Sequence, residues 1–111
     1  MDEPIVYCLI SKSNPTRIYT GYTSNSEKRL KQHNGELTGG ARSTRRYRPW
    51  AYYFKISGFK SKAEAKSFEY KIKHQRVGVG PAGRVATFEK HKQPHLSINK
   101  FSNEDAINLC V

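Results

Sequence analysis

The sequence predicts a small α/β domain of the α+β kind, in which a three-stranded antiparallel sheet is flanked by helices. Two apolar runs rich in β-forming residues, 5–10 and 50–56, indicate two largely buried strands. Two capping-box patterns, each followed by a segment with helical spacing of apolar residues, indicate two helices. The predicted order is strand, strand, helix, strand, helix. At 111 residues the chain has the length of one domain.

The first two strands are predicted to form a hairpin. Residues 5–10 are apolar at every position, which is typical of a strand in the centre of a sheet. Serine, asparagine and proline at 11–15 favour a turn. Residues 17–21 are therefore expected to return as the second strand.

The first helix is predicted to start at the capping box of Ser24 and Glu27 and to run to about Asn34. Gly35 fits a helix stop. Residues 35–49 lack apolar periodicity and contain four arginines, which predicts an irregular basic segment.

The third strand, 50–56, follows this segment. Ser61 and Glu64 form the second capping box, so the second helix is predicted to run to about His74. Glycine and proline at 78–83 are then expected to break the chain, and Ser102 to cap a short terminal helix.

The charge is concentrated in the middle of the chain. Lysine and arginine outnumber aspartate and glutamate by 20 to 9, a formal net charge of +11. Residues 25–74 hold 13 basic and 4 acidic side chains, a net charge of +9. This distribution favours a nucleic acid as the partner. The alternatives are a lysine-rich solvated surface and a ribosomal-type protein that neutralises RNA.

Composition also bears on the compartment. No apolar run approaches the roughly 18 residues of a membrane span, and the acidic start lacks the pattern of a signal peptide. Cys8 and Cys110 are too few for a disulfide framework. We therefore expect an intracellular, soluble protein that is neither secreted nor bound to a membrane, in the cytoplasm or the nucleus.

Glu69 occupies an unusual position on the second predicted helix. It lies beside Phe68, four residues after Ala65 and three before Ile72, so its carboxylate borders the apolar face. A carboxylate on the core side needs a charged partner, a hydrogen-bond network or a metal ion. The alternative is that Glu69 lies at the edge of this face and pairs with a lysine.

Arg29 and His33 form a second unusual pair. Their i, i+4 spacing places them on one face of the first predicted helix, and Leu30 beside Arg29 is the expected core anchor. An arginine held there can bind a phosphate in a bidentate manner, and a histidine can move a proton near pH 7. The alternative is an ordinary solvated helix surface.

Tyr7 and Tyr19 lie on the two strands of the predicted hairpin. Ordinary core packing is one explanation, although both hydroxyls would be costly to bury without partners. A tyrosine serves as a general base only where nearby cations lower its pKa from about 10. Arg29 and a metal ion at Glu69 could supply such cations.

Taken together, these residues resemble the GIY-YIG nuclease superfamily. The residues that carry the resemblance are Val6, Tyr7, Tyr19, Thr20, Gly21, Arg29 and Glu69. Within the superfamily the sequence is most similar to the Slx-type structure-specific endonucleases and their small bacterial relatives, over about residues 5–74. It departs from the pattern by lacking the glycine that leads the first motif. Excision nucleases of the UvrC type carry a tyrosine where His33 stands.

The resemblance implies a GIY-YIG nuclease fold. It places a nuclease core at 4–75 and a C-terminal extension of unknown role at 76–111, within a single domain of 1–111. The Slx proteins also have a zinc-binding RING-like module that contacts a scaffold partner. Cys110 is the only cysteine after residue 74. We therefore expect this module, its zinc and a predictable scaffold partner to be absent.

The resemblance also implies a metal-dependent endonuclease that hydrolyses phosphodiester bonds of DNA. Tyr7 or Tyr19 would activate water, and which of them is the general base stays open. Arg29 would stabilise charge that develops on the phosphate, and His33 would orient the water or shuttle a proton. Glu69 would hold one divalent ion, Mg²⁺ or Mn²⁺.

Basic residues around this site are expected to hold the DNA backbone. The candidates are Arg42, Thr44, Arg45, Arg46, Arg48, Lys60 and Lys62. Phosphate contacts do not read bases, and the sequence has no helix-turn-helix or zinc-finger motif. We therefore expect selection of DNA structure (branches, flaps or nicks) rather than of sequence. The alternative function is a catalytically inactive basic module that binds DNA or RNA.

Overall fold

The computed structural model describes residues 3–75 and 78–100. Its elements are β1 (Ile5–Ser11), β2 (Ile18–Thr23), α1 (Ser26–His33), the 3-10 helix η1 (Arg42–Thr44), β3 (Trp50–Ser57), α2 (Lys62–His74), α3 (Gly80–His91) and β4 (Ser97–Lys100). The predicted α+β class is confirmed, and so are the five predicted elements, which are β1, β2, α1, β3 and α2. The sheet has four strands, however, and not the three that the sequence predicted.

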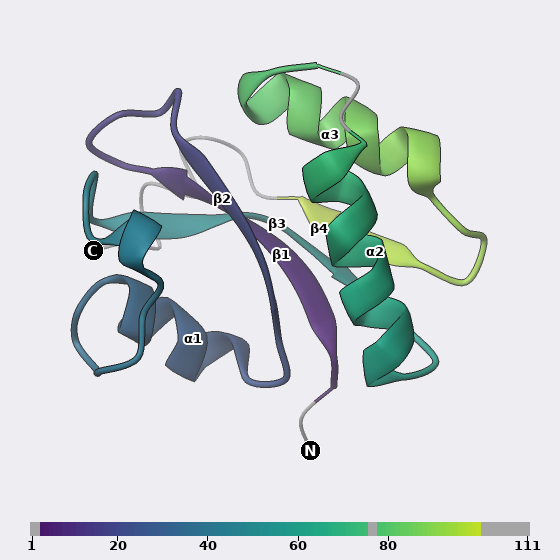
Figure 1. Ribbon diagram of the computed structural model, residues 1–111, viewed down its shortest axis with the longest axis horizontal. Coiled ribbons are helices and arrows are strands. Elements are labelled where there is room, and N and C mark those ends of the chain that lie inside the picture. Colours follow the sequence, from purple (N-terminus) through teal and green to yellow (C-terminus); the bar gives the residue numbers. More distant parts are fainter. Residues whose placement is uncertain (1–2, 76–77, 101–111) are drawn as a thin grey trace.

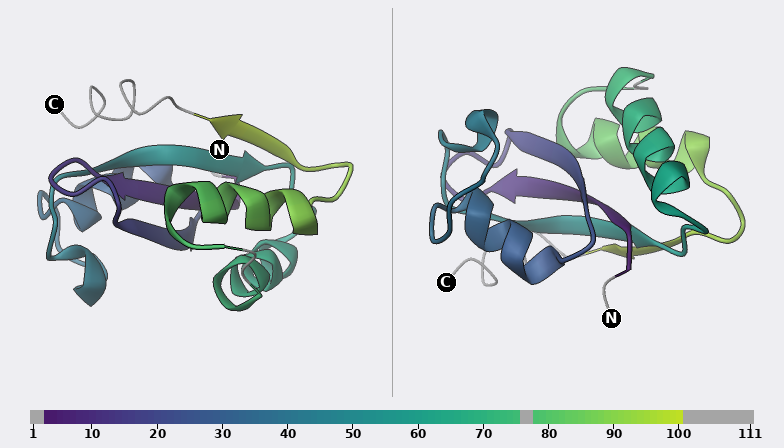
Figure 2. Two further views of the ribbon diagram at one scale, coloured as in Figure 1. Left: turned by 90° about the horizontal axis from the view of Figure 1, so that it is seen from above. Right: turned by 60° about the horizontal axis from the view of Figure 1, so that its bottom comes forward.

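All strands of the sheet are antiparallel, in the order β2-β1-β3-β4. The apolar strand β1 is therefore central, and β2 and β4 form opposite edges, as Figure 2 shows. In the hairpin, Tyr7 pairs with Gly21 and Leu9 with Tyr19. This register places both predicted tyrosines on one face of the sheet, because alternate residues of a strand share a face.

The two faces of the sheet are covered by different helices. On one face, Val6 and Phe54 pack with residues of α2 and with Phe88 of α3. On the other face, Tyr7 and Trp50 form a separate cluster against which Leu30 of α1 packs. Figure 1 shows α1 and α2 on either side of β2. The edge strand β2 is therefore where residues from both helices can meet.

The helix α1 begins one residue later than predicted. Its N-cap is Asn25, whose side chain accepts a hydrogen bond from the backbone N–H of Lys28, so Ser24 is not the cap. Asparagine and serine cap helices about equally well, and the sequence offered both. At the other end Gly35 adopts a φ of 83°, the left-handed conformation typical of a residue that follows a helix. The stop was predicted correctly.

The helix α2 agrees with its prediction at both ends. Ser61 is the N-cap and accepts a hydrogen bond from the backbone N–H of Glu64. The buried residues of α2 are Ala65, Phe68 and Ile72, which is the predicted apolar face. Glu69 thus lies directly beside this face.

The segment after α2 was predicted wrongly. Gly78 lies between the two helices as expected, but Gly80, Pro81 and Gly83 begin α3, with Pro81 in the first turn, where its missing N–H costs nothing. Gly83 packs so closely on the backbone of Gly78 that a side chain would overlap it. Phe88 of α3 is fully buried, and β4 extends the sheet. The helix predicted after Ser102 lies outside the described residues.

No helix in the ranges 3–75 and 78–100 is long and apolar enough to cross a membrane.

Candidate active site

The side chain of Tyr7 extends from the central strand β1 toward α1, where its hydroxyl contacts His33. The residue is fully buried, and its partner in the register is Gly21 of β2. A Cβ atom at Gly21 would overlap the Tyr7 hydroxyl. Gly21 of the Tyr19-Thr20-Gly21 motif therefore leaves room for the Tyr7 hydroxyl.

A chain of hydrogen bonds runs from Tyr7 into the protein interior. The Tyr7 hydroxyl lies 2.7 Å from Nε2 of His33, and Nδ1 of His33 lies 2.9 Å from the Thr44 hydroxyl. Thr44 in turn donates to the carbonyl of Ala41 at 2.8 Å. The single proton of the Thr44 hydroxyl is used in that bond, so Nδ1 of His33 must be the donor to Thr44. In neutral His33, Nε2 then accepts the proton of Tyr7.

Burial and charge keep His33 in this neutral form. His33 has no exposed surface, and its burial lowers its pKa from 6.5 to about 4, assisted by the positive charges of Arg29 and Arg48. At neutral pH the unprotonated Nε2 is therefore available to receive a proton from Tyr7.

Burial acts on Tyr7 against the sequence-based expectation. It raises the pKa of Tyr7 above the ordinary 10.0, although the hydrogen bond from Arg29 lowers it. Of the two cations expected to lower this pKa, Arg29 does so, but the loss of hydration on burial is the larger effect. Tyr7 is thus a neutral phenol that can pass its proton to His33 along their hydrogen bond.

The same burial predicts a pH dependence of stability. Below about pH 6.5 the unfolded chain binds a proton at His33, and the folded chain does so only near pH 4. The free energy of unfolding is therefore expected to fall by about 3 kcal/mol as the pH drops through this window. Thermal unfolding between pH 7.5 and 4 tests this, with His33→Gln expected to have the shallower slope. Parallel slopes for both proteins would contradict it.

Arg29 is fixed by three hydrogen bonds. Its Nε donates to the Tyr7 hydroxyl at 3.3 Å, and its Nη1 donates to Oε1 of Gln32 at 3.0 Å and to the carbonyl of Gly39 at 2.8 Å. Gln32 also donates to the carbonyl of Thr38 at 3.0 Å. The arginine is half-buried rather than solvated, so its guanidinium is held in one place beside Tyr7.

The site includes Gln32, to which sequence reasoning assigned no role. Gln32 joins Arg29 to the turn at Gly39 and Gly40, which passes so close that a Cβ atom on Gly40 would overlap the Gln32 carbonyl. The glycine pair in the sequence is the signal that could have revealed this close approach. The partner it approaches depends on tertiary structure.

Glu69 reaches the site from α2, on the other side of β2. Its side chain is 23% exposed, and its carboxylate lies 3.5 Å from Nζ of Lys73. Nζ of Lys73 also lies 5.4 Å from the centroid of the Tyr19 ring, and that ring lies 4.9 Å from the His33 ring. The pairing with a lysine is therefore present, as the alternative interpretation held. It occurs next to the tyrosines.

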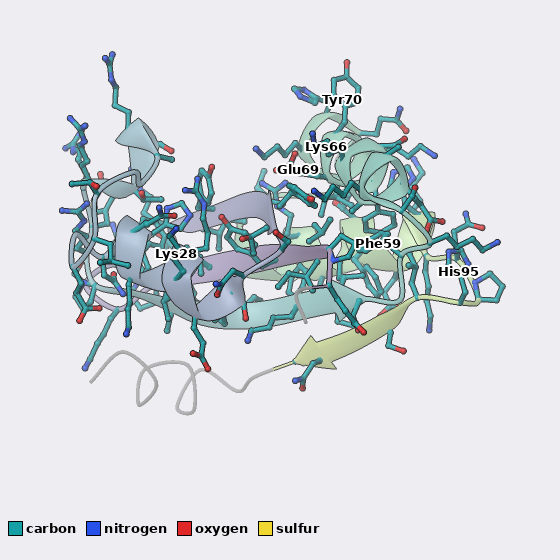
Figure 3. The ribbon with its side chains drawn as sticks, turned by 90° about the horizontal axis from the view of Figure 1, so that it is seen from below. Lys28, Phe59, Lys66, Glu69, Tyr70 and His95 are labelled. Carbon is teal, nitrogen blue, oxygen red and sulfur yellow. The ribbon has the colours of Figure 1, made fainter. Side chains whose placement is uncertain are left out.

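Figure 3 shows Glu69 on the side of α2 that faces α1, with Lys28 of α1 across from it. The negative charge of Glu69 is close enough to Tyr7 to contribute to the raised pKa of the phenol. The structure thus brings Tyr7, Tyr19, Arg29 and His33 into contact, and it places Glu69 at their edge.

The donor atoms at this site fit only a cation with few protein ligands. Within the described part of the chain, no group of three histidine, cysteine, aspartate or glutamate residues could hold a metal ion. Both nitrogens of His33 are already hydrogen-bonded. At this site Glu69 supplies one partly exposed carboxylate, which fits Mg²⁺, an ion that takes one or two carboxylates and completes its coordination with water and phosphate oxygens.

The predicted DNA-binding residues fall into separate groups. Arg42, Arg45 and Arg46 are exposed on and after η1, where Arg46 lies over the Tyr47 ring at 5.3 Å. Arg48 is exposed, but its Nε donates to the His33 carbonyl at 2.7 Å.

Lys60 and Lys62 are exposed at the start of α2, which lies across β1 and β2 from η1 in Figure 1. Thr44 has no exposed surface, so it is in no position to contact DNA. Its hydroxyl instead orients His33. These residues therefore do not form one continuous loop surface, and Thr44 belongs to the interior of the site.

Comparison with known proteins shows the family to which the sequence is similar. The family described as the GIY-YIG catalytic domain matches residues 3–77. That range contains Tyr7, Tyr19, Arg29, His33 and Glu69.

Three relatives illustrate how far the similarity extends. The chain is 46% identical over 66 residues to the structure-specific endonuclease subunit SLX1 homolog of Giardia intestinalis, covering 58% of this chain and 18% of that protein. It is 37% identical over 90 residues to structure-specific endonuclease subunit slx1 of Schizosaccharomyces pombe, covering 78% and 32%. It is 42% identical over 98 residues to structure-specific endonuclease subunit SLX1 of Candida dubliniensis, covering 84% and 34%. The chain spans about a third or less of these relatives.

Proposed function

The chain belongs to the GIY-YIG family, and on this premise we propose that it is a metal-dependent endonuclease that hydrolyses phosphodiester bonds of DNA and selects DNA by structure. The observation that carries the proposal is the hydrogen bond from the buried Tyr7 hydroxyl to neutral His33, beside the fixed guanidinium of Arg29. The relatives named above are structure-specific endonuclease subunits, and the proposed selection of DNA by structure follows their names.

In the proposed reaction, Tyr7 is the general base. Its proton moves to Nε2 of His33 while its oxygen takes a proton from the attacking water. The resulting hydroxide forms the new bond to phosphorus, the bond from phosphorus to the 3′ oxygen breaks, and that oxygen takes a proton from solvent. His33 then returns its proton to the Tyr7 oxygen, and Tyr7 releases the proton taken from water to solvent, which restores the starting state. Nδ1 of His33 keeps its proton in the bond to Thr44 throughout.

Arg29 and Glu69 supply the charges that this reaction needs. Arg29 stabilises the developing phenolate of Tyr7 and the charge on the nonbridging phosphate oxygens. Glu69 would hold the divalent ion, Mg²⁺ or Mn²⁺, and when bound this ion supplies positive charge at the leaving oxygen. An ion that takes the Glu69 oxygens would displace Lys73, whose distance of 3.5 Å makes it a weak partner.

The proposal is tested by cleavage of branched, flapped, nicked and linear DNA of the same sequence in Mg²⁺ or Mn²⁺. Arg29→Ala is expected to lower kcat by about 10²–10³-fold on every cleaved substrate. Arg17→Ala removes an exposed arginine outside the site and should leave kcat unchanged. Tight, salt-sensitive binding without cleavage of any substrate would contradict the proposal. It would favour the catalytically inactive DNA- or RNA-binding module.

Gln32→Ala is expected to lower kcat by about tenfold with little change in KM. The substitution removes one acceptor of Arg29 Nη1 and its link to Thr38, so the guanidinium is less well held when the transition state forms. Steady-state cleavage of the best substrate measures this, with exposed Lys31→Ala as the control on the same helix. An unchanged kcat would show that the bonds to Tyr7 and Gly39 are enough to hold Arg29.

A further inference from the structure

An exposed pair of aromatic rings lies on α2, next to the proposed active site. Tyr70 is 60% exposed, and its ring centroid lies 4.2 Å from that of His74, which is also exposed. Among the residues that the structure describes, the exposed large hydrophobic side chains are Leu37, Tyr70 and Val79. Tyr70 is the only aromatic residue of these three, so an exposed ring at this position calls for an explanation.

Tyr70 directly follows Glu69 in α2. Successive residues of an α-helix point about 100° apart. In Figure 3, accordingly, Glu69 faces α1 while Tyr70 projects from the outer side of the helix, away from the sheet. Their Cα atoms are about 3.8 Å apart. At about 3.4 Å of rise per nucleotide, the two side chains leave the helix within about one nucleotide of each other.

The surface around these rings is positively charged. The helix α2 carries the four lysines Lys62, Lys66, Lys71 and Lys73 against two glutamates, Glu64 and Glu69. Glu64 is paired with His95 at 2.6 Å. A DNA strand that passes α2 would thus meet lysines before and after Tyr70 along the helix. Surfaces that bind single-stranded DNA combine basic groups and stacking rings in this way.

We propose that Tyr70, backed by His74, stacks on an unpaired base of branched or flapped DNA near the cleavage site. This inference rests on the proposed function and adds to it a contact through which single-stranded DNA is recognised. A base within a duplex has both faces covered by its neighbours. An unpaired base at a flap or junction has a free face, so an exposed ring favours DNA that contains such a base over continuous duplex.

The test measures binding without cleavage, in metal-free buffer with the whole chain. The probe is a flapped DNA with the fluorescent base 2-aminopurine at the first unpaired position, and a nicked duplex of the same sequence is the comparison. Stacking on Tyr70 should quench the probe when wild type binds. Tyr70→Ala should remove most of this quenching and weaken flap binding about tenfold, with nicked-duplex binding unchanged.

Two further variants separate stacking from charge. Tyr70→Phe keeps the ring and should behave as wild type. Lys71→Ala removes an exposed lysine of the same helix. It should weaken the binding of flapped DNA and of nicked duplex equally, without changing the quenching. Equal loss of flap and nicked-duplex binding in Tyr70→Ala, or unchanged quenching, would overturn the inference.

Because the readout needs no catalysis, it is separate from the test of the proposed function. A chain that cleaves DNA but shows no effect of Tyr70 would lose only the stacking site. A chain that fails to cleave but shows the quenching would lose the proposed function and keep the site.

Discussion

Tyr7→Phe is expected to lower kcat for DNA cleavage by about 10²–10⁴-fold while leaving DNA affinity nearly unchanged. The substitution removes the hydroxyl that His33 and Arg29 both contact, and with it the proposed general base. The phenyl ring retains the packing of Tyr7 with Tyr19 and Tyr52. Single-turnover cleavage and equilibrium binding of the same substrate separate the two effects.

Tyr52→Phe is the matched control for this prediction. Tyr52 is also buried and packs edge-on against the Tyr7 ring, but its hydroxyl donates to the backbone carbonyl of Ser26. We expect Tyr52→Phe to lose about 1 kcal/mol of stability and to keep its kcat. If Tyr7→Phe cleaved at the wild-type rate, the general base would have to be another group, and Tyr19 would be the first candidate.

The sequence predicted that Tyr7 and Tyr19 lie on the two strands of one hairpin, although it did not predict the register between them. Tyr7, Tyr19 and Gly21 belong to two short strands joined by residues 12–17, and the register together with the alternation of side chains along each strand places the two tyrosines on one face. Arg29 and His33 were placed together by helical spacing for the same kind of reason. Local periodicity was sufficient for these residues, because each pair is separated by few residues within one element or hairpin.

The parts that the sequence did not predict depend on contacts across the fold. From its place in an arginine-rich segment, Thr44 was predicted to contact DNA, but the tertiary structure buries it against His33. The region that begins at Gly80 reads as a chain break, but Phe88 completes the core and β4 extends the sheet. The similarity to the Candida dubliniensis relative covers 84% of the chain and so extends past residue 77 into α3.

The pKa of Tyr7 shows why residue types alone did not settle the mechanism. The sequence shows the nearby cations, which lower this pKa, but it does not show how deeply Tyr7 is buried. In the structure, burial raises the pKa more than Arg29 lowers it. The role of His33 changes accordingly. A phenol with a raised pKa needs a neighbouring base, and His33, with its pKa lowered to about 4, presents an unprotonated nitrogen to it.

Glu69→Gln is expected to abolish the metal dependence of cleavage and to lower kcat by about 10³-fold. The variant keeps the size of the side chain and removes the charge that would hold a divalent ion. Lys73 loses its partner at the same time, but the loss of this partly exposed ion pair should change the stability little. The measurement is the initial rate of cleavage as Mg²⁺ or Mn²⁺ is titrated, where wild type should saturate and Glu69→Gln should stay near its metal-free rate.

Glu64→Gln separates this effect from a general loss of negative charge on α2. Glu64 lies on the same helix, but its carboxylate contacts His95 and the backbone N–H of Lys60, away from the tyrosines. This variant should show the wild-type titration curve. Metal-free DNA binding should be unchanged or slightly tighter in Glu69→Gln, because a carboxylate without an ion repels phosphate. A Glu69→Gln variant that still saturates with Mg²⁺ would mean that the ion is held elsewhere. Glu69 would then be only the partner of Lys73, and the proposed mechanism would lose its metal site.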